Sequence, residues 1–375
     1  MSFGKITIHR AVLVVFAAAG ILAGTSSLAA ASAHTTPASS SLLVSAHVTA
    51  MSPKATLAYW TPARLRAAKP ANIITAGSNA SAPQAPASPA GKPGSVPGGV
   101  PAGSGAAAAA HPAAALTPAL HNNYSYPFPY TISQVPASSY TKYPWDLNGK
   151  LFFSNAGGNY VCSATSVGSA SGTSDENEIW TAGHCAANTA GTHVWDSSAV
   201  FIPAYNGTVS NVDPFGEFTW TGGAETTSAW LNSSDLTEDE AAMTVGNSST
   251  TGRTLGQAVG WDGFAWNYPV TENFTAFGYP AASPYNGLTM YQDSAPTGTQ
   301  DTGISGADAT KPIGIGNPMT GGSSGGAWNI DWTTSNPGYI DGHNDYKYGS
   351  QPLAMYSPYQ DTLSNTVRCF GASSC

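Results

Sequence analysis

From about Tyr143 onward, the sequence consists of short runs of β-branched and aromatic residues separated by Gly, Asn, Ser and Pro. Such runs favour strands, and the residues between them favour turns. We expect strands at 151–153, 194–195, 199–202, 215–220, 259–261, 274–278 and 353–356. Because no long amphipathic helix pattern interrupts these runs, the sequence predicts an all-β fold, either a sandwich or a pair of barrels.

The first 33 residues have the pattern of an export signal. Lys5 and Arg10 precede an apolar run from Ala11 to Ala23, and Ala31-Ser32-Ala33 has the small residues of a cleavage site. We therefore predict a signal peptide at 1–33 and a secreted, extracellular protein. No later stretch approaches the ~20 consecutive apolar residues of a membrane span, which predicts no stable membrane association.

Charge divides the rest of the chain. Residues 1–120 contain seven Lys and Arg and no Asp or Glu, whereas residues 121–375 contain six Lys and Arg and 21 Asp and Glu. We interpret 34–120 as a prosegment, including an Ala-, Pro-, Gly- and Ser-rich linker at 71–119, whose charge attracts it to an acidic domain at 121–375. The alternative is that the basic leader serves export alone. The acidic domain predicts no nucleic-acid partner.

One part of the leader has the signals of a short helix. Thr61-Pro62 is a typical helix start, a basic stretch follows it, and Pro70 is a typical stop.

The four cysteines suit an oxidising destination and form two close pairs in the sequence, Cys162 with Cys185 and Cys369 with Cys375. Four cysteines allow three connectivities. We choose a bridge between Cys162 and Cys185, because it would hold the residue before Cys185, a histidine, to a neighbouring strand. The pairing of Cys369 with Cys375 rests on proximity alone. Neither C-x-x-C nor H-E-x-x-H spacing occurs, so we expect no metal and no cofactor.

Two strings carry nucleophilic chemistry. Thr181-Ala182-Gly183-His184-Cys185 follows an apolar pair and is typical of a strand that ends in a turn, and the string GGSSGG at 321–326 sets Ser324 among glycines. A Gly and Ser cluster alone is usually a loop, but a serine hydroxyl becomes a nucleophile when a base such as His184 takes its proton. We predict an oxyanion hole from the N–H groups of Gly322 and Ser324, because glycines let the backbone turn sharply.

Four strings of the sequence resemble those of secreted bacterial trypsin-like serine peptidases of the chymotrypsin superfamily, in its glutamyl-endopeptidase-like and streptogrisin-like branches. They are CSAT at 162–165, WTAGHC at 180–185, FGYP at 277–280 and MTGGSSGG at 319–326. The resemblance covers roughly residues 143–375. It implies two six-stranded antiparallel β-barrels with the active site between them, and it supports the bridge between Cys162 and Cys185.

The catalytic acid should lie between the histidine and the serine in the sequence. Asp239 stands at the head of the apolar run 241–245, as the resemblance implies, and Asp235 is the alternative. The sequence departs from the family pattern at Glu240, where an apolar or aromatic residue is usual, and at Ala327, where proline is usual. Neither departure removes a catalytic group.

The resemblance also places substrate-binding residues and bears on activation. Met319 and the segment His343-Asn344-Asp345 should border the substrate pocket, with Met319, His343 and Asn344 as the candidate binding residues, although a surface position is the alternative for His343. Ser323 stands where animal trypsin-like enzymes have the aspartate that pairs with a new N-terminus. We therefore expect activation to follow from loss of the prosegment.

These residues predict a monomeric, secreted serine endopeptidase that cleaves protein or peptide substrates through an acyl-enzyme. One alternative is a catalytically inactive binding domain at the cell surface. Another is an esterase, since Gly322, Ser324 and Gly326 satisfy G-x-S-x-G. The esterase fold requires the order Ser, Asp, His, and only His343 follows the serine.

Overall fold

The fold is described from a computed structural model. The structure describes residues 44–48, 51–71, 91–103, 124–168, 176–188 and 194–369. The expected signal peptide at 1–33 and the second cysteine of the expected C-terminal pair, Cys375, lie outside the described residues.

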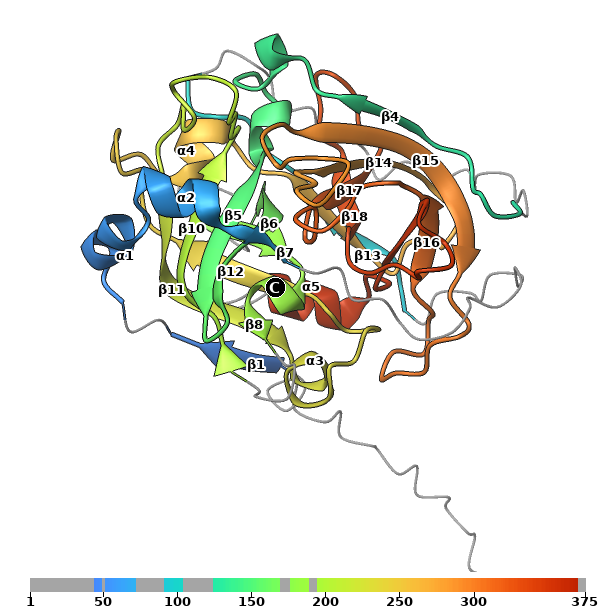
Figure 1. Ribbon diagram of the computed structural model, residues 1–375. Helices are drawn as coiled ribbons and strands as arrows, with labels where there is room; N and C mark the ends of the chain where they lie inside the picture. Colours follow the sequence, from blue (N-terminus) through green and yellow to red (C-terminus); the bar gives the residue numbers. More distant parts are fainter. Residues whose placement is uncertain are drawn as a thin grey trace, which may run out of the picture. The chain divides into compact units, whose positions relative to one another are not determined.

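Six antiparallel strands close into a first barrel (Figure 1). They are β5 (Asn148–Asn155), β6 (Gly158–Val167), β7 (Glu178–Thr181), β10 (Ser197–Pro203), β11 (Phe218–Thr227) and β12 (Ala241–Val245). The ladder runs β11-β10-β5-β6-β7-β12, and β12 pairs back with β11. Leu151 and Phe153 of β5 pack in one apolar cluster and Phe152 in another, because successive side chains of a strand point to opposite faces.

A second set of six strands follows in the chain. It comprises β14 (Asn273–Gly278), β15 (Tyr291–Gln300), β16 (Ile313–Gly316), β17 (Ala327–Ile330), β18 (Tyr339–His343) and β19 (Ala354–Ser357). The antiparallel order is β19-β16-β15-β14-β17-β18, and a bridge between Tyr346 and Tyr356 joins the segment after β18 back to β19. The predicted all-β fold of two barrels is therefore confirmed.

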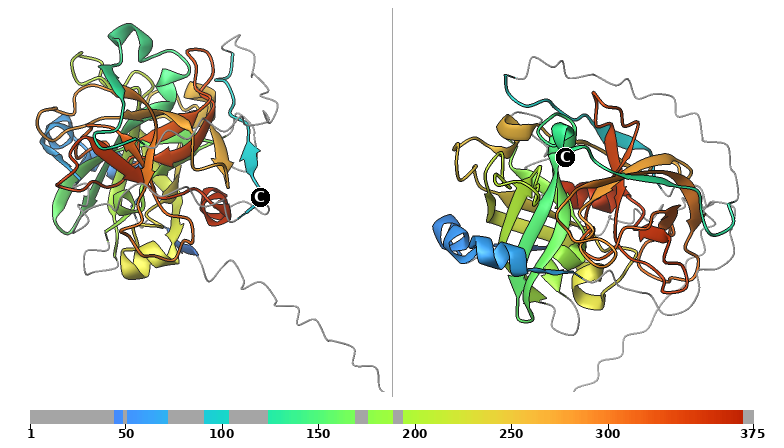
Figure 2. Two further views of the ribbon diagram at one scale, coloured as in Figure 1. Left: turned by 90° about the vertical axis from the view of Figure 1, so that its right-hand side faces the viewer. Right: turned by 45° about the horizontal axis from the view of Figure 1, so that its top comes forward.

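Shorter elements surround these strands (Figure 2). At the edges of the second sheet, β13 (Gly263–Trp266) pairs in parallel with β18, and β4 (Thr131–Gln134) pairs with β15. The remaining elements are the two-stranded sheet of β8 (Ala187–Asn188) and β9 (Val194–Trp195), η2 (Ala137–Ser139), η3 (Trp145–Leu147), α3 (Ser228–Ser233), α4 (Leu255–Val259) and α5 (Thr362–Arg368). Helix α5 contacts β11, β12 and β13, so it touches strands of both sheets. None of the helices in the described ranges is long and apolar enough to cross a membrane.

The leader contributes elements to both sheets. Strand β1 (Val44–His47) pairs with β11, β2 (Lys69–Pro70) lies parallel to β6, and β3 (Gly94–Val96) pairs with β13. Helix α1 (Pro53–Tyr59) contacts β10 and β11, and α2 (Pro62–Ala67) follows it. The predicted helix start is confirmed, because the Thr61 side chain accepts a hydrogen bond from the N–H of Arg64 at 3.3 Å.

Two stretches differ from the expectation. Residues 94–96 form a strand within the predicted linker, and Gly94 approaches the ring of Trp266 so closely that a Cβ there would clash with it. The predicted strand at 259–261 is wrong, because Val259 ends helix α4. That helix begins with a capping box between Thr254 and Gln257. The prediction relied on the aromatic and β-branched residues and did not use this helix-start signal.

Candidate active site

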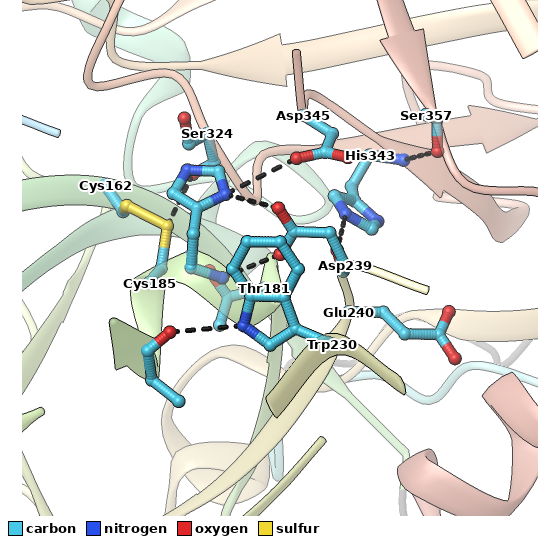
Figure 3. Close-up of polar contacts among 12 residues, drawn as sticks. Cys162, Thr181, Cys185, Trp230, Asp239, Glu240, Ser324, His343, Asp345 and Ser357 are labelled. Atoms are coloured by element: carbon cyan, nitrogen blue, oxygen red, sulfur yellow. Dashed lines mark hydrogen bonds and ion pairs between the residues drawn. A yellow bond between two sulfur atoms is a disulfide. The ribbon is translucent and has the colours of Figure 1, made fainter. Parts of the chain in front are cut away.

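The pairing of two barrel strands places His184 beside Asp239. Strand β7 leads into the short 3-10 helix η4 (Gly183–Cys185), and β7 pairs with β12, whose first residue follows Asp239 by two positions. The N–H of His184 donates to Oδ1 of Asp239 at 2.7 Å, and its Nδ1 lies 2.9 Å from Oδ2 (Figure 3). A Cβ on Gly183 would stand only 2.7 Å from Oδ1, so a glycine permits this close approach.

The other candidate acid, Asp235, lies elsewhere. Its Oδ1 accepts hydrogen bonds from the N–H and hydroxyl of Thr237 at 3.0 and 2.8 Å, and its Oδ2 accepts one from the N–H of Ala307 at 2.6 Å. Asp235 therefore shapes a turn, and Asp239 is the one of the two carboxylates that contacts His184.

A disulfide holds the histidine turn to the neighbouring strand. Cys162 of β6 and Cys185 of η4 are bonded, as predicted. The sulfur of Cys185 also lies 3.8 Å from the carbonyl oxygen of Ser324. The serine is therefore next to the residue that follows His184.

The loop that carries Ser324 belongs to the second sheet but is held by the first. The carbonyl oxygen of Ser324 accepts a hydrogen bond from the N–H of Ser163 at 2.7 Å. The hydroxyl of Ser163 donates to the carbonyl of Gly322 at 3.0 Å. Gly322 and Gly325 have φ angles of +96° and +79°, which side chains with a Cβ rarely adopt. Ser163 thus fixes the loop against β6.

The backbone N–H groups of residues 321–326 differ in their hydrogen bonds. Those of Ser323, Gly325 and Gly326 donate to the carbonyls of Thr320, Asn344 and Ser323. Over the described ranges, the N–H groups of Gly321, Gly322 and Ser324 make no hydrogen bond. Two of these three, those of Gly322 and Ser324, are the donors predicted to form an oxyanion hole.

The hydroxyl of Ser324 and Nε2 of His184 are both buried, and neither has a hydrogen-bond partner in the described part of the chain. Proton transfer between a serine nucleophile and its base would join these two atoms. No hydrogen bond joins them in this structure.

A second carboxyl group, which the sequence analysis did not select, faces the histidine. Asp345 follows β18, and its Oδ1 lies 3.4 Å from Nδ1 of His184 (Figure 3). Its segment was noted only as a border of the substrate pocket. The sequence held no signal for this contact, because it depends on how the loop after β18 meets the first barrel.

Burial and charge set the pKa values at this site. Burial disfavours the charged form of His184, but Asp239 and then Asp345, both as anions, raise the pKa of His184 to about 10, so that with both carboxyl groups ionised the imidazole keeps its proton at neutral pH. Burial first, and then the charge of Asp239, raise the pKa of Asp345 well above its usual range. Burial lowers the pKa of His343 to about 4, so His343 is neutral and its Nε2–H donates to the carbonyl of Asp239 at 2.9 Å.

The three predicted pocket residues are buried. Asn344 donates through Nδ2 to the carbonyl oxygens of Phe277 and Ser323 at 2.7 and 3.2 Å, and this nitrogen lies 3.9 Å from Sδ of Met319. His343 turns instead toward Asp239. Asn344 therefore bonds to the serine loop through the carbonyl of Ser323 and also contacts Met319, and the role of all three residues in substrate binding stays a prediction.

Two groups of His, Cys and Asp side chains in the described ranges are close enough to share a cation. The first contains Cys162, His184 and Cys185, but its cysteines are joined in a disulfide and offer no thiolate. The second contains His184, Asp239 and Asp345, where Nδ1 of the histidine already bonds to a carboxylate. The second group is the same cluster of His184 and two carboxyl groups described above.

Comparisons with known proteins agree with the two-barrel fold. No protein-family model matches the chain, and no curated protein matches it. Among solved structures, the chain is similar to the thermostable serine protease AL20 from an extremophilic microorganism, with 30% identity and a TM-score of 0.53, over 64% of this chain and 100% of that one. It is also similar to the protease Anisep from Arthrobacter nicotinovorans, with 31% identity and a TM-score of 0.52, over 62% and 99% of the two chains.

These relatives and the two-barrel fold define a class of protein, the serine proteases built from paired β-barrels. The chain belongs to the chymotrypsin-like serine protease family of bacteria. The esterase alternative required the α/β-hydrolase fold, whereas the described residues form two β-barrels.

Proposed function

We propose that the protein is a secreted, monomeric serine endopeptidase that hydrolyses peptide bonds in protein or peptide substrates. Ser324 is the nucleophile, His184 is the general base and then the general acid, and Asp239 orients the imidazole. One observation carries the proposal: the pairing of His184 with Asp239 beside a serine whose loop has N–H groups, including those of Gly322 and Ser324, that make no hydrogen bond to a described residue.

In the proposed reaction, the hydroxyl of Ser324 attacks the carbonyl carbon of the scissile peptide bond, and Nε2 of His184 takes its proton. The N–H groups of Gly322 and Ser324 stabilise the negative charge that develops on the substrate oxygen. His184 then gives its proton to the leaving amine, which leaves an acyl-enzyme at Ser324. A water molecule hydrolyses this ester, with His184 again acting as the base.

Labelling with a fluorophosphonate probe, together with casein hydrolysis, tests this function. The wild-type protein should react with the probe and degrade casein, and Ser324→Ala should do neither. Ser323→Ala is a matched control, because Ser323 donates its hydroxyl to the carbonyl of Thr320 and should leave the labelling intact. Labelling that persists in Ser324→Ala would exclude Ser324 as the nucleophile.

A second candidate function is a catalytically inactive binding domain. It is favoured by the missing hydrogen bond between the hydroxyl of Ser324 and Nε2 of His184. In free enzymes, however, catalytic hydrogen bonds are often long and tighten only when substrate binds. A wild-type protein that folds but neither reacts with the probe nor hydrolyses casein would support the binding domain.

We also propose that residues 34–120 act as a prosegment that hinders the site until it is cut. The N–H of Ala71 donates to the carbonyl of Val161 on β6 at 2.9 Å. The carbonyl of Ala71 lies 2.7 Å from the position that a Cβ on Gly321 would take. The leader backbone therefore lies against the start of the loop that carries Ser324, where it would obstruct a substrate.

A further inference from the structure

A buried carboxyl group beside the catalytic pair has no part in the proposed reaction. The side chain of Asp345 has no exposed surface, and its Oδ1 lies 3.4 Å from Nδ1 of His184, the atom that bonds to Asp239 at 2.9 Å. Ligand atoms of these three residues all lie within 4.8 Å of one another. Two carboxyl groups and one imidazole therefore share one buried space.

Electrostatic repulsion disfavours a state in which Asp239 and Asp345 are both ionised. Like charges at this separation disfavour each other's ionised form, and burial adds to the effect. In the described part of the chain, no Lys or Arg forms an ion pair with Asp239 or Asp345, and His184 is the one basic residue that does. One of the two carboxyl groups should therefore hold a proton.

The hydrogen bonds indicate which group holds it. Asp239 accepts two bonds from His184, one from the backbone N–H and one from Nδ1, and these stabilise its charged form. Among the described residues, the donor near Asp345 is Nδ1 of His184 at 3.4 Å, and this nitrogen already bonds to Asp239 at the shorter distance of 2.9 Å. A buried carboxylate with so weak a donor is costly, so the proton belongs on Asp345.

We propose that Asp345 is a positioning residue whose protonated carboxyl group donates a hydrogen bond to Asp239 and holds that carboxylate against His184. The inference rests on the proposed function. If Asp345 were ionised, two anions would face the imidazole, and His184 would keep its proton at neutral pH. A protonated imidazole has no free nitrogen to accept the proton of Ser324. A general base works best when its pKa lies near the working pH.

Three other titratable groups face this cluster. His343 is neutral, since burial lowers its pKa to about 4, and it donates to the backbone carbonyl of Asp239. Tyr346 follows Asp345, and burial raises the pKa of its hydroxyl well above the usual range. Burial raises the pKa of Asp196 to about 7, and the charge of His184 partly opposes this rise. Because Asp196 also titrates near neutral pH, a variant of Asp196 is included as a control for the pH profile.

The inference is tested by the pH dependence of kcat and KM for a peptide that the wild type cleaves. The wild type is compared with the variants Asp345→Asn, Asp345→Ala and Asp196→Asn. Wild-type kcat should decline at alkaline pH as Asp345 loses its proton. Asp345→Asn should keep its activity there, because a carboxamide donates a hydrogen bond and cannot ionise. Asp345→Ala should lower kcat about tenfold or more at every pH with KM unchanged, since the donor is lost. Asp196→Asn should keep the wild-type profile.

Three results would overturn the inference: a shared alkaline decline in wild type and Asp345→Asn, equal kcat values for Asp345→Ala and Asp345→Asn, or loss of the decline in Asp196→Asn. If the Asn variant does not fold, Asp345→Ser supplies a smaller donor, and the same alkaline activity is expected of it.

A measurement without substrate compares the wild type with Asp345→Asn. The NMR signal of the Nδ1 proton of His184 should show an alkaline shift in the wild type that Asp345→Asn lacks, because ionisation of Asp345 adds a charge 3.4 Å away, whereas titration of the His184 ring is common to both proteins. A wild-type signal that does not move there, or that moves equally in Asp345→Asn, overturns the inference. A wild-type protein that is inactive and unlabelled would refute the proposed function instead, while this titration would still report on Asp345.

Discussion

Asp239 binds His184 twice, through the backbone N–H at 2.7 Å and through Nδ1 of the ring at 2.9 Å. The carboxylate thus fixes the main chain and the ring of the same residue. A carboxylate only accepts hydrogen bonds, so the contact selects the tautomer with its proton on Nδ1. In the neutral ring, Nε2 is then the acceptor, which is the form that a general base requires.

The first prediction concerns this contact. Asp239→Asn should lower kcat by about four orders of magnitude, because an amide can donate to Nδ1 and favour the wrong tautomer. Steady-state hydrolysis of a peptide substrate measures the loss. Asp235→Asn is the matched control, since Asp235 bonds to Thr237 and Ala307 and should leave kcat nearly unchanged. Equal losses in the two variants would refute the role of Asp239.

The second prediction concerns the oxyanion hole. Gly322→Ala should lower kcat by about 10²–10³-fold, the usual effect of losing one donor. At its φ of +96°, a Cβ would stand 2.8 Å from Cβ of Ala281 and 3.0 Å from the carbonyl oxygen of Tyr279, so the N–H would turn away. Gly252→Ala controls for backbone strain alone, because Gly252 has a φ of +69° and open space around its Cβ position. A kcat that falls as much in the control would speak against the hole.

Much of this candidate site could be predicted from the sequence, because the motifs that mark it are short and local. Glycines around a serine and a histidine beside a cysteine are visible without any knowledge of strand pairing. The choice between Asp235 and Asp239 was harder, since both lie just before β12. It depends on contacts such as that of Asp235 with Ala307, which lies far along the chain.

The contact of Asp345 with His184 could not be predicted from the sequence. This contact links residues far apart in the sequence through the meeting of two barrels, and no local pattern encodes it. Glu240 illustrates a related limit. It stands where an apolar residue is usual, yet it is 1% exposed, and burial raises its pKa well above the usual range. A neutral carboxyl group can occupy a buried position that its charged form could not.

The third prediction concerns the disulfide. Replacing Cys162 and Cys185 together by Ala should lower the free energy of unfolding by about 3 kcal/mol, because the bridge closes a loop with a sequence separation of 23 residues. Urea denaturation measures this change. KM should change little, since neither cysteine is expected to contact substrate. An unchanged denaturation midpoint would show that the bridge does not stabilise the fold.

The fourth prediction concerns docking of the leader. Trp60 is 2% exposed, its indole N–H donates to the carbonyl of Ser198, and its ring lies 5.8 Å from that of Phe152. Trp60→Ala should weaken docking by about 3–5 kcal/mol, as for other large buried aromatic side chains. In the full chain, an added protease should then cut residues 51–71 faster, and casein hydrolysis should appear sooner. Val48→Ala is the control, because Val48 is exposed. If Trp60→Ala is cut as slowly as the wild type, the leader is not held by this contact.

The fifth prediction concerns stability and pH. Burial raises the pKa values of Asp293 and Asp308 to about 7, and that of Glu238 to about 9 with help from neighbouring acids. Between the lower pKa values of the unfolded chain and these higher ones, the folded protein binds more protons, so a rise in pH favours unfolding. The melting temperature should therefore be highest in acid, fall as pH rises through about 7, and continue to fall toward about 9. Asp293→Asn should reduce the decline near neutral pH, because a carboxamide does not ionise. Melting curves recorded from about pH 4 to about pH 9 test this, and a melting temperature that peaks above neutral pH would contradict it.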